Sequence, residues 1–91
     1  MTLEADRDRG ERAKRLLEGD LMVEAFTALE AALHDAWTGS KTPEERERLW
    51  AERQAMIRFK GHFEQAVNTG KLAARQLAEA EEKAKRKRKA A

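Results

Sequence analysis

The most constraining feature of this sequence is a helix stop followed at once by a strong helix start. Residues 38–40, Thr-Gly-Ser, break a helix, and residues 42–45, Thr-Pro-Glu-Glu, carry the signals of a new one. Proline suits the first helical position, and Thr42 and Glu45 have the spacing of a capping box. Because the connection is short, the helices on its two sides are predicted to be antiparallel neighbours.

The segment 20–38, before this turn, is predicted to be a helix with a wide apolar face. Its large apolar residues recur at spacings of three and four, which is the period of an α-helix. Leu21, Ala25 and further alanines widen the stripe to about half of the circumference, more than one partner helix can cover. We therefore expect Leu21 and Ala25 to lie in an interface with a partner. The stripe itself consists of Met22, Phe26, Leu29, Leu33 and Trp37.

The segment 43–69, after the turn, is predicted to be a helix with two apolar lines. Trp50 and Ile57 form the second line, roughly 100° around the helix from the first. Gly61 lies on the same side, where a missing side chain would let another backbone approach. We expect these three residues to contact a partner. Trp37 and Trp50 flank the turn, so the alternative for Trp50 is that both tryptophans pack the closed end of the hairpin. The first line consists of Leu49, Met56, Phe63 and Val67.

Shorter helices are expected on both sides of the hairpin. Residues 6–18 form the first, which can fold over residues 62–69 and cover Phe63 and Val67. Gly19 is expected to end this helix, and Asp20 to cap the next one.

The run 68–70, Asn-Thr-Gly, predicts a break or a bend before a last helix over residues 71–82. In this helix three glutamates each lie four residues before a lysine or arginine, an order that stabilises a helix. The pairs are Glu79–Lys83, Glu81–Lys85 and Glu82–Arg86. We define residues 83–91 as the basic tail and expect it to continue this helix.

The predicted fold class is all-α: a short helix, a long antiparallel hairpin and a charged last helix. Residues 1–82 are taken as one domain.

Charge is unevenly distributed along the chain. Residues 1–82 hold all seventeen acidic residues and thirteen basic ones, a net charge of −4, whereas residues 83–89 carry +6. This run is predicted to be a solvated helix end, a contact for nucleic-acid phosphates, or a contact for an acidic protein. No aromatic residue interrupts it, so base stacking is not expected. Its basic residues are Lys83, Lys85, Arg86, Lys87, Arg88 and Lys89.

No catalytic, cofactor or metal site is predicted. The chain has no cysteine, and Ser40 lies in the turn without the signature of an activated nucleophile. Glu30 and His34 are four residues apart, so they could place two ligands on one face of a helix. A zinc site normally takes three or four protein ligands, so this pair alone does not predict one. The longest apolar stretches are far shorter than the roughly 20 residues that span a bilayer, so no membrane segment is expected. The charged N-terminal residues do not predict a secretory signal.

Two runs of this sequence, joined by a short polar turn, resemble small proteins of tailed phages and prophages. They read ERAKRLLEGDLMVEAFTALEAALHDAW and ERERLWAERQAMIRFKGHFEQAVNTGKLAARQLAE. Such proteins are often encoded near head-assembly and DNA-packaging genes, and the hairpin is also similar to the oligomerisation hairpin of small terminase subunits. The features that carry the resemblance are residues 13–17, 20–26 and 48–50, Trp37, and residues 70–73.

The resemblance implies a non-enzymatic, self-associating structural protein of phage head assembly or DNA packaging. One alternative is a small-terminase-like packaging component whose basic tail contacts DNA without sequence specificity. Another is an early phage protein that inhibits a host factor by binding it. The expected partners are further copies of the chain, a phage head or packaging protein, and DNA. The expected location is the cytoplasm of the bacterial host, or the virion after incorporation.

Overall fold

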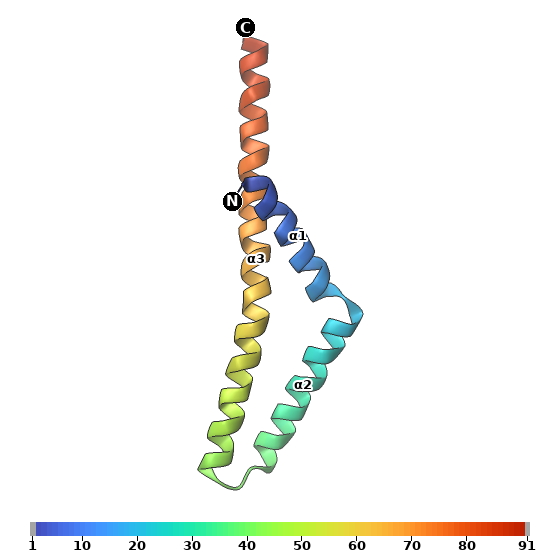
Figure 1. Ribbon diagram of the computed structural model, residues 1–91, viewed down its shortest axis with the longest axis vertical. Coiled ribbons are helices and arrows are strands. Elements are labelled where there is room, and N and C mark those ends of the chain that lie inside the picture. The colour runs from blue at the N-terminus through green and yellow to red at the C-terminus, as the bar shows by residue number, and fades with distance from the viewer. Residues whose placement is uncertain (1, 91) are drawn as a thin grey trace. The chain divides into compact units, whose positions relative to one another are not determined.

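The computed structural model describes residues 2–90, which form three α-helices and no strand (Figure 1). The helices are α1 (Leu3–Glu18), α2 (Asp20–Gly39) and α3 (Pro43–Ala90). The predicted all-α class is confirmed. The chain divides into two compact units, and α1 and α3 each have residues in both. The crossing unit, as we call it, contains α1 up to Arg15 together with α3 from Phe63, and the hairpin unit contains residues 16–62.

The hairpin unit is closed by a hydrogen-bonded turn between α2 and α3 (Figure 1). The Glu45 amide donates to Thr42 Oγ1 at 3.1 Å, as the capping-box spacing predicts. Glu45 also reaches back, but its Oε2 accepts from the Lys41 amide at 3.0 Å and not from that of Thr42. On the α2 side, the Ser40 amide and hydroxyl both donate to the Trp37 carbonyl, at 3.1 and 2.6 Å. The turn thus supplies hydrogen-bond partners to both helix ends.

The core of the hairpin unit is thin. Leu33 of α2 packs with Leu49 and Met56 of α3, and these three are its buried apolar residues. Phe26 packs against them partly buried, with its ring centroid 6.3 Å from that of Phe59. The four residues of this core belong to the predicted stripe of α2 and to the predicted first line of α3. They meet because antiparallel helices with periodic stripes bury the stripe along which they touch.

The crossing unit is held by small residues. Gly10 and Ala13 of α1 are buried, and so are Ala66, Gly70 and Ala73 of α3. The two backbones approach so closely that a Cβ added to Gly70 would lie 2.7 Å from Gly10 Cα. A Cβ added to Gly10 would lie 2.9 Å from the Ala66 carbonyl oxygen. Only glycine can occupy both positions at this distance.

This crossing explains why the predicted break at Gly70 is wrong. α3 continues as one helix of 48 residues from Pro43 to Ala90, with no positive-φ glycine among the described residues. Gly70 therefore serves the approach of α1 and does not form a turn. The predicted helices 43–69 and 71–82 are one element, which the basic tail continues up to Ala90.

Two helix starts also differ from the prediction. α1 begins at Leu3 and not at residue 6, because Thr2 Oγ1 accepts from the Ala5 amide at 3.1 Å and caps the first turn. α2 is preceded by Gly19, whose extended backbone (φ −64°, ψ 140°) occupies the N-cap position. Asp20 is the first helical residue, so its side chain is not the predicted cap, although an acidic group there still suits the helix dipole.

The crossing predicts opposite effects for two glycine-to-alanine changes in α3. Gly70→Ala should lower the free energy of unfolding by about 1–3 kcal/mol, because the added methyl group overlaps the backbone of α1. Gly61→Ala is the matched control, since nothing lies within 4 Å of its added Cβ. It should raise stability by about 0.5–1 kcal/mol through helix propensity. Urea denaturation followed by circular dichroism measures both. Equal stabilisation by the two changes would contradict the crossing.

The turn predicts a local dependence on Thr42. Thr42→Ala removes the acceptor for the Glu45 amide and should destabilise the protein by about 1 kcal/mol. Thr42→Ser keeps the hydroxyl and serves as the control, with a smaller loss. An unchanged urea midpoint for Thr42→Ala would mean that this cap contributes nothing to α3.

Candidate interaction surfaces

Residues 2–90 contain no group of three or more metal-ligating side chains placed to hold an ion. Glu30 and His34 line the same cavity, but no third ligand joins them. Ser40, the one serine, donates its hydroxyl to a carbonyl within the turn. Within the described residues, no helix is both long and apolar enough to traverse a lipid bilayer. The candidate functional features among the described residues are cavities and charged segments.

An apolar groove opens along one side of the hairpin unit. It has a volume of about 500 Å³ and lies between α2 and α3. Phe59 is 55% exposed and Leu29 44% exposed, so large apolar side chains at its edges remain in contact with water. Glu52 is the one charged residue of the lining. The rest of the lining consists of Met22, Ala25, Phe26, Leu29, Leu33, Ala55, Met56 and Phe59.

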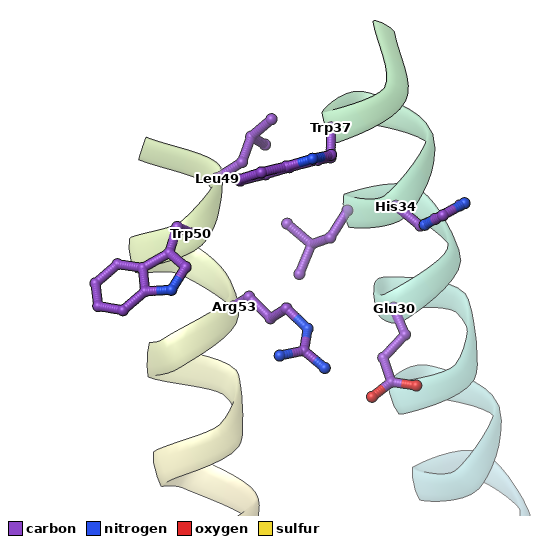
Figure 2. Close-up of a pocket in the computed structure, with 7 residues that line it drawn as sticks. Glu30, His34, Trp37, Leu49, Trp50 and Arg53 are labelled. Carbon is purple, nitrogen blue, oxygen red and sulfur yellow. The ribbon is translucent and has the colours of Figure 1, made fainter. Parts of the chain in front are cut away.

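A second, smaller cavity of about 260 Å³ lies near the closed end of the hairpin unit. Figure 2 shows Trp37 reaching across toward Leu49, whereas Trp50 points away from α2. Arg53 and Glu30 both point into the space between the helices. Trp50 is 57% exposed, so of the two tryptophans only Trp37 spans the gap as the packing alternative requires.

The predicted interface residues lie on two sides of the hairpin unit. Ala25 lines the apolar groove, and Leu21 on the same helix is 81% exposed. Trp50 and Ile57 lie on a different side of α3, roughly 100–180° around the helix from the groove-lining residues of α3. Gly61 shares that side, and an added Cβ there would meet no atom of this chain. All five are accessible to a partner, and their role in an interface stays a prediction.

The basic tail is an exposed helix. Every residue from 78 to 90 is exposed. Two of the three predicted pairs form, with Lys85 Nζ 3.8 Å from Glu81 and Arg86 3.3 Å from Glu82. Exposed pairs of this kind contribute only a few tenths of a kcal/mol. The tail is thus an accessible cationic segment whose charges are only partly paired.

The two units carry opposite net charge. The crossing unit holds thirteen basic and eight acidic residues, +5, and the hairpin unit holds six basic and nine acidic residues, −3. The sequence showed a basic tail, but not that the basic residues of α1 join it in one unit. Arg7 and Lys14 come together with Lys71 around one hollow. Their spacing of seven residues on α1 was the only local signal.

No protein-family model, curated protein or solved structure matches this chain. The resemblance to small phage proteins therefore stays a prediction, supported by the sequence features that carry it.

Proposed function

We propose that this chain is a non-enzymatic helical protein that associates with further copies of itself through its hairpin unit. The observation that carries the proposal is the apolar groove between α2 and α3. The sequence resemblance extends the proposal to a role in phage head assembly or DNA packaging, in the cytoplasm of the bacterial host or within the virion.

The exposed apolar side chains of the hairpin unit support association. Leu29 is 44% exposed and Phe59 is 55% exposed. Moving such a side chain from full exposure to full burial stabilises by about 1.5–3 kcal/mol, so covering the exposed half of each would contribute roughly half of that.

A second copy is the occupant that we propose for the groove. Ala25 and Ala55 are small, so another helix can approach closely between the larger groove residues. Glu52 lines the groove, and Lys60 lies beside it with Nζ 5.5 Å from the centre of the Phe26 ring. A twofold axis midway between Glu52 and Lys60 would bring each carboxylate toward the ammonium group of the second copy. Such a surface is complementary to itself, as a twofold interface requires.

A second candidate function is a small-terminase-like packaging component that contacts DNA. The charge difference between the units favours it, because +5 in the crossing unit includes the accessible basic tail. The third reading, inhibition of a host factor, would use the same apolar groove for a different protein. Self-association is preferred because the groove carries both an acidic and a basic residue at its edges.

Introducing carboxylates into the groove should dissociate the assembly. The double variant Leu29→Glu with Phe59→Glu should give a helical monomer, because association would bury four carboxylates without partners in each dimer. The variant Trp50→Glu with Ile57→Glu tests the second apolar side and should also lower the oligomeric state relative to the unmodified protein. Sedimentation equilibrium measures the state, and circular dichroism checks that the helices persist.

The control for these variants is Thr27→Glu with Ala51→Glu, which adds the same two charges at exposed positions that line neither cavity. It should leave the oligomeric state unchanged. A helical monomer for the unmodified protein would contradict self-association and leave the groove to a different partner. Dissociation by the control as readily as by the groove variant would show that added charge alone is responsible.

A further inference from the structure

A hollow beside the crossing of α1 and α3 is lined mainly by basic side chains. It has a volume of about 180 Å³. Arg7 and Lys14 come from α1 and Lys71 comes from α3, with Glu11 as the one acidic member. We call this hollow the cradle. The remaining lining residues are Gly10, Val67, Gly70 and Ala74.

We propose that the cradle, together with the basic tail, binds the phosphate backbone of duplex DNA. The proposal uses the crossing unit alone and so does not depend on self-association of the hairpin. It deepens the second candidate function, because it names a phosphate site outside the basic tail.

The cradle depends on the glycine crossing. Because Gly10 and Gly70 have no side chains, the two backbones meet and the neighbouring basic residues flank the contact. Arg7 lies one turn before Gly10, and Lys14 one turn after it. Lys71 directly follows Gly70 on the facing helix. The crossing thus brings Lys71 of α3 beside two cations of α1 that lie at least 57 residues earlier in the sequence. The space between the three is large enough for a phosphate group.

The charges of the cradle are available to a ligand. The Nε of Arg7 donates to Asp8 at 3.2 Å, which uses one of five guanidinium N–H groups and leaves the terminal nitrogens to donate. Lys14 and Lys71 are both exposed. The lining carries a net charge of +2, which the Asp8 carboxylate paired with Arg7 lowers to +1 for the whole cluster. Arginine and lysine side chains both form charge-assisted hydrogen bonds to phosphate oxygens.

The cradle and the basic tail share a face of α3. At about 100° per residue, Lys71, Arg75 and Lys89 fall within roughly 40° of one another. At 1.5 Å per residue, Lys71 and Lys89 lie about 27 Å apart along the helix, a length over which duplex DNA presents about sixteen phosphates. Glu82 lies on the same face, but its carboxylate is paired with Arg86. One duplex can therefore contact both groups of cations.

The chemistry favours nucleic acid over a membrane or an acidic protein. Residues 78–90 contain no apolar side chain larger than alanine, so this helix cannot insert into a lipid surface. Protein interfaces depend on buried aromatic or arginine anchors; this segment has no aromatic residue, and its two arginines, Arg86 and Arg88, are exposed. A regular series of phosphates needs only accessible cations along a line.

The experiment measures anisotropy of a short fluorescein-labelled duplex with full-length variants across about 50 to 200 mM NaCl. The cradle variant is Arg7→Gln, Lys14→Gln and Lys71→Gln. It should reduce the slope of log affinity against log salt by about 2–3 and weaken binding at least about tenfold. The matched control removes three exposed charges from the hairpin unit, Lys41→Gln, Arg48→Gln and Arg58→Gln. It should change the slope by less than about 1.

Two further variants separate the cradle from the tail. Replacing the six basic residues of the tail with Gln should weaken binding but leave a residual slope of about −2 to −3 from the cradle. Glu11→Gln should strengthen binding, whereas Glu47→Gln in the hairpin unit should not. In NMR spectra of the unmodified protein, the amides of Gly10 and Gly70 should shift on addition of DNA more than those of Gly39 and Gly61.

Three results would overturn the cradle. Equal losses in the cradle and control variants would assign the effect to net charge alone. Complete loss of binding in the tail variant would place the whole contact on the tail and preserve the second candidate function without the cradle. No binding by the unmodified protein at the lowest salt would overturn both. Circular dichroism confirms that each variant keeps its helices.

Discussion

Two helices bury only the stripe along which they touch, and this limit governs the hairpin unit. Its buried apolar residues are Leu33, Leu49 and Met56, with Phe26 partly covered. The face of α2 is wider than that stripe, so residues such as Leu29 stay exposed beside the groove. A third helix could cover them, but within the hairpin unit none is available. The open groove is therefore a consequence of the helix count, and association is the ordinary way to cover such a surface.

The crossing unit meets the same limit with different residues. It buries alanines and glycines where the hairpin unit buries leucine and methionine. Small side chains remove little apolar area from water, but they let backbones approach until dispersion contacts become dense. Glycine within a helix costs about 1 kcal/mol relative to alanine. At Gly10 and Gly70 that cost is offset by a contact that any larger residue would prevent. At Gly61 no contact within this chain offsets it.

Features that depend on neighbouring residues were predictable from the sequence, whereas features that depend on contacts between distant residues were not. The turn was predictable because Thr42, Pro43 and Glu45 act within one helical turn of one another, and the amide of Glu45 does reach Thr42. The apolar stripes were predictable for the same reason. Gly70 was misinterpreted as a break, because its role depends on Gly10, sixty residues away in the chain. The cradle was hidden for that reason too, since Lys71 joins Arg7 and Lys14 only through the crossing. Asp20 shows that even a local cap can be displaced by one residue.

The division of charge connects the two proposals. A single cationic surface binds duplex DNA without sequence specificity only weakly, with dissociation constants of about 10⁻⁴ to 10⁻⁶ M. Copies joined through their hairpin units would bring several cationic crossing units to one duplex. The second and later contacts then become intramolecular, and the overall affinity can rise by about 10² to 10⁴ without any new contact. The net charge of −3 would repel phosphate from the hairpin unit, so DNA would meet the crossing units and leave the apolar groove to protein. Self-association and phosphate binding would thus reinforce each other while using separate surfaces.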